Sequence, residues 1–223
     1  MLKYLRTRKT MWVVMASFTL SAIAGCSSKP TSQSQAPANS NQITGAGSSF
    51  VFPVMTQWIN SYQASHPGVN INYQSIGSGG GIRQLQQGLL DFAASDAALN
   101  DEQLKGMPPL VQIPESAGPV CITYNLPDLK APLKLSSETL SAIYLGRIKE
   151  WNDPAIAKEN PGVSLPAVAV AVVHRSESSG TTNIFTTYLA TVSPAWKQQV
   201  GNGINVNWPV GLGEKATREL WAW

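Results

Sequence analysis

The sequence is poor in charged residues and in cysteine, and it lacks several motifs that mark common functional sites. Charged residues make up 13% of its 223 residues, and only two residues are cysteines. No G-x-x-x-x-G-K-[ST] motif is present, so the glycine-rich segments are not a nucleotide P-loop. No spacing of Cys, His and acidic residues indicates a metal site, and we expect neither a metal nor another cofactor.

The net charge of +3 is concentrated at the start of the chain. Four of the 16 basic residues, Lys3, Arg6, Arg8 and Lys9, lie in the first ten positions, and no acidic residue precedes Cys26. Without those four, 12 basic residues face 13 acidic ones. This balance excludes a strongly basic protein that binds nucleic acid or a membrane surface through charge.

Residues 1–25 have the pattern of a secretory signal sequence. The basic start precedes an apolar stretch from Met11 to Ile23, which is too short to span a bilayer comfortably. The stretch ends in Ile23-Ala24-Gly25-Cys26, which resembles the bacterial lipoprotein box and predicts lipidation of Cys26. An ordinary cleaved signal with a stray cysteine and a plain transmembrane anchor are the alternatives.

Residues 26–42 are rich in Ser, Gln, Asn, Pro and Ala, and this composition predicts a flexible tether. With Cys26 lipidated, Cys121 has no partner, so we expect no disulfide framework. Cys121 lies in an apolar run and is expected to be a small residue of a buried strand.

Four short segments combine small hydroxyl residues or glycines with almost no charge. Glycine allows backbone N–H groups to approach an anion, and a helix N-terminus offers unpaired N–H groups and a favourable dipole. Hydroxyls donate further hydrogen bonds, and one arginine can hold two oxygens. These features predict a cage of dipoles for a small oxyanion, with Arg175 as its only cation. The segments are Thr44–Phe50, Ile76–Gly81, Asp91–Asp96 and His174–Thr182.

Strand-like and helix-like segments alternate along the chain, which predicts an α/β protein with ligand loops at the carboxyl ends of its strands. We expect strands at residues 43–44, 69–75, 92–95, 111–113, 120–124 and 168–173. We expect helices at residues 51–63, 82–88, 101–105, 136–144 and 182–190. In the second of these helices Leu85 and Leu89 are predicted to face inward.

From Ile43 to Gly213 the chain resembles the periplasmic phosphate-binding proteins of Pst-type ABC transporters. The resemblance rests on the four segments, in the family's order, together with Glu150–Ile156 and Pro161–Val163. It implies a two-lobed Venus-flytrap fold of the type II periplasmic-binding proteins, with lobe one at 43–118 and lobe two at 119–213. It also implies the phosphate ligands Ser49, Phe50 (through its backbone N–H), Ser78, Asp96, Arg175, Ser179, Gly180 and Thr181.

The chain departs from the family pattern in two places of the last loop. Glu177 stands where many relatives have Asp, and Ser178 stands where Gly is usual. The role of a second carboxylate near the site is therefore open. Ser48 is expected to be a turn residue, and alternation predicts that His174 points away from Arg175.

The resemblance implies a non-enzymatic receptor that binds inorganic phosphate outside the cytoplasmic membrane. It would deliver phosphate to the transmembrane permease subunits of an ABC importer and is expected to be a monomer. A secreted phosphatase is the main alternative, although no base or metal is visible beside Ser49, Ser78 or Ser179. A sensor or adhesin on the same fold is a third possibility.

Asp96 is the unusual member of the set, because a carboxylate should repel a phosphate dianion. Phosphate at neutral pH still carries a proton, and a carboxylate can accept that O–H, whereas sulfate has no proton to donate. Asp96 is thus predicted to discriminate between the two anions. The alternative is that Asp96 caps the turn Ala97–Leu99.

The last ten residues, Glu214–Trp223, do not resemble the family, whose members continue with something like Gly-Gly-Lys-Gly-Asn-Glu-Gly-Val. Codons for Glu-Lys-Ala-Thr-Arg-Glu-Leu, displaced by one base, can read Gly-Lys-Gly-Asn-Glu-Gly-Val. We hypothesise a frameshift, in the gene or in its sequencing, that truncated the protein. On this hypothesis lobe two is incomplete, apolar sheet surface is exposed, and the 223-residue product is unstable and binds phosphate poorly.

Replacing Cys26 by serine tests the lipoprotein prediction. Cys26→Ser should move the protein from the membrane fraction into a soluble fraction, because the acceptor of the lipid is lost. Fractionation and mass spectrometry of the mature N-terminus make the measurement. An unmodified Cys26 in the wild-type protein would contradict it.

Overall fold

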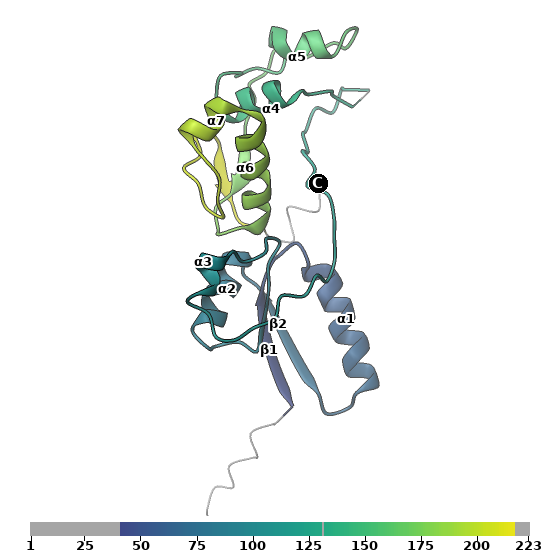
Figure 1. Cartoon of the computed structure of the whole chain (residues 1–223). Coiled ribbons are helices and arrows are strands. Elements are labelled where there is room, and N and C mark those ends of the chain that lie inside the picture. Colours follow the sequence, from purple (N-terminus) through teal and green to yellow (C-terminus); the bar gives the residue numbers. More distant parts are fainter. Residues whose placement is uncertain (1–40, 131, 217–223) are drawn as a thin grey trace, which may run out of the picture. The chain divides into compact units, whose positions relative to one another are not determined.

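The computed structural model describes residues 41–130 and 132–216, and these form a mixed α/β protein, as predicted (Figure 1). The signal sequence, Cys26 and nearly all of the tether lie outside the described residues. In chain order the elements are β1 (Gln42–Gly47), α1 (Phe52–Ser65), β2 (Asn70–Ser75), α2 (Ser78–Gln86), β3 (Phe92–Ala94), α3 (Asp101–Leu104), α4 (Ser137–Tyr144), α5 (Pro154–Glu159), β4 (Val173–Arg175), α6 (Gly180–Val192), α7 (Pro194–Gln199) and β5 (Leu212–Glu214).

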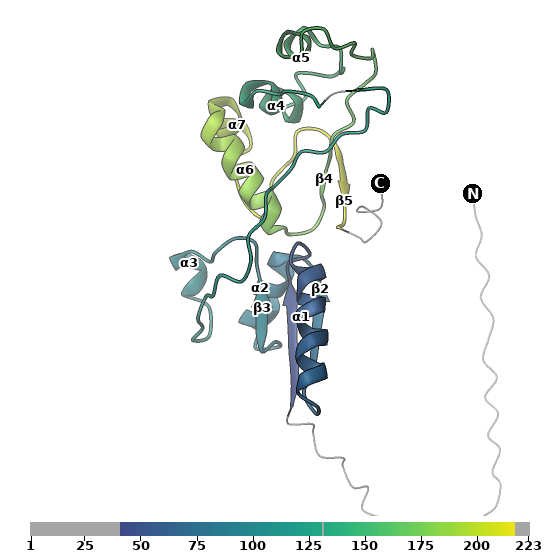
Figure 2. The ribbon, with the colours of Figure 1, turned by 90° about the vertical axis from the view of Figure 1, so that its right-hand side faces the viewer.

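The first three strands form a parallel sheet in the order β2-β1-β3. The crossover through α1 and the crossover through α2 run in opposite directions across this sheet. Right-handed crossovers therefore place the two helices on opposite faces, as Figures 1 and 2 show. Gly47 is paired with Ser75 on one side and with Ala94 on the other. The loops after all three strands thus begin at one edge of the sheet.

A small apolar core holds α1 on the sheet. Met55 of the helix packs with Val51, Tyr73 and Ala94, and all four are buried. Pro53 lies in the first turn, where a missing N–H leaves no helical hydrogen bond unmade. The core therefore fixes the N-terminal half of α1, directly after the loop that follows β1.

The elements from α4 to β5 pack around two apolar clusters. Leu140, Leu189 and Trp196 belong to one, and Ile143 and Ile156 belong to the other. Polar side chains accept a backbone N–H at the start of each helix, which satisfies donors that have no partner inside the helix. These caps are Ser136 on α4, Asp153 on α5, Ser179 on α6 and Ser193 on α7.

Strands β4 and β5 form a second, two-stranded parallel sheet, in which Arg175 lies opposite Glu214. The predicted strand at 168–173 is therefore largely wrong, because the ladder with β5 begins only at Val173. Glu214, the first residue of the tail that does not resemble the family, lies within β5. Residues 217–223 of that tail are outside the described residues.

The boundaries of two other elements differ from the predictions. The strand predicted at 43–44 is longer in the structure, because residues 45–47 pair with strands on both sides and continue β1. The helix predicted at 82–88 begins earlier, because residues 78–81 form the first turn of α2. That helix ends at Gln86, so Leu89 lies beyond it and is exposed rather than inward.

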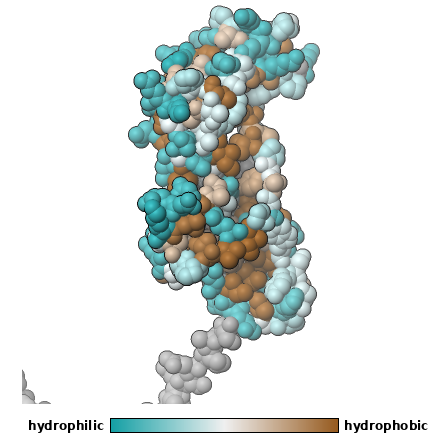
Figure 3. Space-filling view, viewed as in Figure 1, coloured by the Kyte–Doolittle hydropathy of each residue, from teal (hydrophilic) through white to brown (hydrophobic). Residues whose placement is uncertain are grey.

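The predicted strands at 111–113 and 120–124 are wrong. Within the described part of the chain no strand pairs with this segment, so its apolar side chains have no sheet face to cover. Val111 and Ile113 are 83% and 78% exposed, and Cys121 is an exposed free cysteine instead of a core residue. Figure 3 shows apolar residues in patches between hydrophilic areas on the face that it draws. None of the helices in the described ranges is both long enough and apolar enough to cross a membrane.

Truncation of Leu189 tests the core around α6. Leu189 is fully buried, so Leu189→Ala should lower the free energy of unfolding by about 2–5 kcal/mol through lost burial and a residual cavity. Ile184→Ala is the matched control on the same helix, since Ile184 is 41% exposed and should cost about 1 kcal/mol or less. Urea denaturation measures both. Equal losses for the two variants would contradict this packing.

Candidate functional site

The turn after β1 supplies the first part of the candidate site. Ser48 is buried, and its backbone N–H donates to the carbonyl of Ala94 at 2.8 Å. The N–H of Phe50 donates to Ser48 Oγ at 3.0 Å. The donor that the resemblance assigns to the anion is therefore engaged locally in this structure, while the Phe50 ring is partly exposed.

The first turn of α2 supplies the second part. Ser78 is buried at the start of the helix, and its hydroxyl accepts the backbone N–H of Asp96 at 3.3 Å. Gly81 allows this turn to lie against the end of β1, because a Cβ atom there would stand 2.6 Å from the carbonyl oxygen of Ala46. Gly81 thus serves close backbone packing, and Ser78 reaches the site from a fixed helix end.

The N-terminus of α6 supplies the third part. Ser179 is buried and caps the helix by accepting the N–H of Thr182 at 3.2 Å. A Cβ atom on Gly180 would stand 2.7 Å from both Asp96 Cβ and Ser78 Oγ, so a larger residue would push these segments apart. Glycine at this position is what lets two loops distant in sequence meet.

Two side-chain hydrogen bonds complete the cluster. Thr181 Oγ1 donates to Asp96 Oδ2 at 2.9 Å, and Arg175 Nη2 donates to Ser49 Oγ at 3.0 Å. The structure therefore brings all of the predicted ligands together in one region. They are Ser49, Phe50, Ser78, Asp96, Arg175, Ser179, Gly180 and Thr181.

The Asp96 carboxylate accepts one hydroxyl on each oxygen. Ser48 donates to Oδ1, and Thr181 donates to Oδ2. The turn after Asp96 is bonded by Ser95 instead, whose hydroxyl accepts the N–H of Ala97 and donates to the carbonyl of that residue. The alternative of Asp96 as the cap of this turn therefore finds no support in the hydrogen bonds. Ser48, expected to be only a turn residue, is the direct neighbour that the sequence reasoning missed.

Arg175 is balanced by Glu177. Arg175 Nε donates to Glu177 Oε1 at 2.6 Å, and the same oxygen accepts the N–H of Ala216 at 3.1 Å. Burial raises the pKa of the Glu177 carboxyl, but hydrogen bonds from Arg175 and the backbone, with the charge of Arg175, lower that pKa overall. Glu177 Oε1 thus faces both Nε and Nη2 of the guanidinium, and Nη2 also reaches Ser49.

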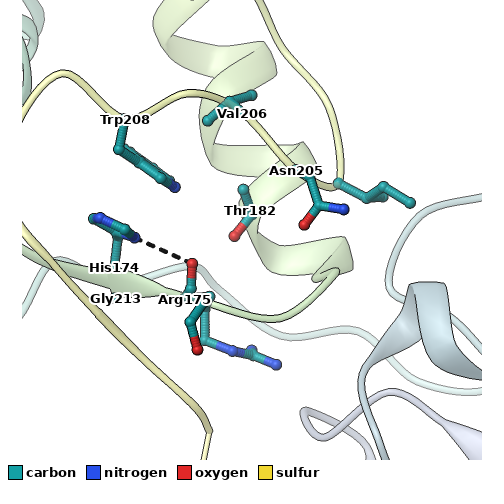
Figure 4. Close-up of a pocket in the computed structure, with 9 residues that line it drawn as sticks. His174, Arg175, Thr182, Asn205, Val206, Trp208 and Gly213 are labelled. Atoms are coloured by element: carbon teal, nitrogen blue, oxygen red, sulfur yellow. Dashed lines mark hydrogen bonds between the residues drawn. The ribbon is translucent and has the colours of Figure 1, made fainter. Parts of the chain in front are cut away.

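A pocket of about 280 Å³ lies beside Arg175 and includes His174, Asn205 and Trp208 in its wall (Figure 4). The His174 ring stacks on Trp208 with centroids 4.7 Å apart, and its Nδ1 lies 3.1 Å from the carbonyl oxygen of Arg175. Figure 4 shows the Arg175 side chain leading away from these rings. His174 is therefore a packed wall residue. In residues 41–130 and 132–216 no group of three His, Cys, Asp or Glu residues could hold a metal ion.

Comparison with known proteins gives one family match and several relatives. The PBP superfamily domain matches residues 32–216. The phosphate-binding protein PstS of Pasteurella multocida is 48% identical over 182 residues, which cover 81% of this chain and 52% of that protein. The phosphate-binding protein PstS of Xylella fastidiosa strain 9a5c is 45% identical over 192 residues, 86% of this chain and 52% of that protein.

The chain spans about half the length of these curated relatives. A solved ABC-type phosphate transport receptor from Vibrio cholerae matches with a TM-score of 0.47 and 20% identity over 80% of this chain and 64% of that chain. The fold of this chain is therefore assigned from the family that matches residues 32–216 and not from this structural similarity.

The acid side of the stability curve tests the Arg175–Glu177 pair. The pKa of Glu177 in the folded state lies below its ordinary value of 4.5. Its contribution to the free energy of unfolding is therefore fully present above that ordinary value and is lost as the pH falls through the folded-state pKa. The difference in unfolding free energy between the wild type and Glu177→Gln should therefore be largest above about pH 5 and shrink below about pH 4. Denaturant titrations across this range make the measurement. A difference that does not depend on pH would contradict the pairing.

Proposed function

Because the chain belongs to the PBP superfamily, we propose that it binds inorganic phosphate at the cluster around Asp96 and acts as a receptor for an ABC importer. The observation that carries the proposal is the setting of Asp96. Asp96 is the only carboxylate among the eight predicted ligands, and its two oxygens accept hydroxyls from two segments that are distant in sequence. The names of the relatives from Pasteurella multocida and Xylella fastidiosa support phosphate as the ligand.

The proposed ligands suit phosphate better than a generic anion. Ser78 and Gly180 lie in the first turns of α2 and α6, where backbone N–H groups and the helix dipole favour negative charge. Arg175 provides two more donors in a planar fork and is already balanced by Glu177. A site with so little net positive charge selects by hydrogen-bond geometry, and Asp96 then requires an oxyanion that carries a proton.

A receptor fits these contacts better than a phosphatase. The hydroxyl of Ser49 accepts from Arg175, that of Ser78 accepts a backbone N–H, and that of Ser179 caps a helix. A nucleophilic serine needs a base to take its proton, and the described neighbours of these three hydroxyls include no histidine. The relatives are named as binding proteins, which supports the same reading.

The proposed setting is outside the cytoplasmic membrane. A signal sequence at 1–25 and lipidation at Cys26 would hold the protein at the membrane surface, with residues 26–42 as the tether. The proposed partners are the permease subunits of the importer, with the receptor itself a monomer. The proposed ligand contacts divide between lobe one at 43–118 and lobe two at 119–213.

Neutralising Asp96 tests selectivity. Asp96→Asn should weaken phosphate binding and raise the affinity for sulfate relative to phosphate, because an amide can donate to an oxygen that carries no proton. Calorimetric titration of both anions at pH 7 measures the two dissociation constants. Asp101→Asn removes an exposed carboxylate and serves as the control. An unchanged ratio in Asp96→Asn would refute the assigned role.

Replacing Arg175 by alanine tests how much the only Arg or Lys residue in the four segments contributes to the binding of phosphate. Arg175→Ala should weaken phosphate binding by at least about 2 kcal/mol, the scale of hydrogen bonds between charged partners. Arg175→Lys should restore little, because an ammonium lacks the planar fork that meets Ser49 and Glu177 together. Arg83→Ala removes an exposed charge from α2 as the control. Wild-type affinity in Arg175→Ala would exclude Arg175 from the site.

A further inference from the structure

Ser48 is a buried serine whose backbone is fixed on both sides. Its side chain and backbone together are 1% exposed, and its N–H donates to the carbonyl of Ala94 at 2.8 Å. Its own carbonyl accepts the hydroxyl of Tyr73 at 2.8 Å. Burial, with the charges of Glu115 and Asp96, raises the pKa of Tyr73, so this phenol keeps the proton that it donates. The position of Ser48 therefore does not depend on a ligand.

The direction of the Ser48 hydroxyl is also fixed. A serine hydroxyl has one hydrogen to donate and two lone pairs with which to accept. Ser48 Oγ accepts the N–H of Phe50 at 3.0 Å and the N–H of Val51 at 3.4 Å. With both acceptor positions used by backbone donors, the hydrogen is left for Asp96 Oδ1, with which Oγ is hydrogen-bonded.

We propose that Ser48 is a positioning residue that holds the Asp96 carboxylate in the orientation in which it accepts the O–H of a protonated oxyanion. This inference rests on the proposed function of the site. A carboxylate has about four lone-pair positions, of which Ser48 occupies one on Oδ1 and Thr181 occupies one on Oδ2. The remaining positions can accept the proton of the anion, and their direction is set by the two hydroxyls.

The fixed orientation of the Asp96 carboxylate favours phosphate and disfavours sulfate. The terminal torsion of an aspartate side chain is broad, so a carboxylate without such bonds turns easily. A carboxylate that can turn relieves its repulsion from sulfate, which has no proton to donate. A carboxylate that is held presents lone pairs to every bound anion and so penalises the anion that carries no proton. Ser48 acts on discrimination through Asp96 and does not need to touch the anion.

The experiment compares Ser48→Ala with wild type in the full 223-residue chain, using inorganic phosphate and sulfate as probes. The dissociation constant for phosphate should rise about tenfold, the scale of a hydrogen bond to a charged group. The dissociation constant for sulfate should fall, or rise by less than about twofold, because a carboxylate that can turn repels sulfate less. Ser65→Ala is the matched control, because its hydroxyl bonds only backbone carbonyls and His66 at the other end of α1. It should leave both constants unchanged.

A double-mutant cycle shows whether Ser48 acts through Asp96. In an Asp96→Asn background, Ser48→Ala should change the phosphate constant by less than about twofold, because the oriented carboxylate is already lost. If Ser48→Ala lowers the unfolding midpoint into the assay range, Ser48→Cys keeps the volume with a weaker donor and should show the same loss of discrimination.

Three outcomes separate the inference from the proposed function. Equal weakening of both anions by Ser48→Ala would overturn the inference and reduce Ser48 to a structural residue of the turn. An undiminished effect of Ser48→Ala in the Asp96→Asn background would overturn it as well. A wild-type chain that binds neither anion would instead overturn the proposed function for this 223-residue chain and would favour the hypothesis that it is a truncated product.

Discussion

The hydrogen bonds on the Asp96 carboxylate are the constraint on which the rest of the site depends. One oxygen takes the hydroxyl of Ser48, which follows β1, and the other takes the hydroxyl of Thr181, in the first turn of α6. Such a meeting requires the ends of β1 and β3 to lie at one edge of the sheet, and the parallel register provides this. It also requires Gly180, since any Cβ atom there would collide with Asp96. The sheet, the glycine and the carboxylate are thus parts of one arrangement.

Around that carboxylate the protein uses dipoles more than charge. Arg175 is the only cation in the four loops, and Glu177 balances it with a hydrogen bond at 2.6 Å. A strongly positive site would bind any dianion, whereas a balanced site with oriented donors depends on where each oxygen and each proton of the ligand lies. The same balance gives Ser48 its proposed role. In a site without excess charge, the orientation of one carboxylate has a large effect on the discrimination between phosphate and sulfate.

Much of the fold and of the site could be predicted, and the failures have physical causes. The helices predicted at 136–144 and 182–190 are confirmed as α4 and α6, and each begins at a local signal, a serine whose side chain accepts a backbone N–H of the first turn. The prediction of a strand around Cys121 was wrong. An apolar run becomes a strand only when another strand pairs with it, and none of the described strands pairs with this run. Ser48 was missed because its value lies in a contact with Asp96, 48 residues away, which no local pattern displays. The available signal was the place of Ser48 in the glycine-rich segment Thr44–Phe50, directly after β1.

The most direct test of the central claim is a titration of the purified wild-type chain with phosphate in the presence of excess sulfate. Selection by proton donation to Asp96 predicts that phosphate binds with a constant that a hundredfold excess of sulfate barely changes, on the order of twofold or less. A phosphate signal that sulfate abolishes in proportion to its concentration would contradict the account, because the site would then respond to negative charge alone.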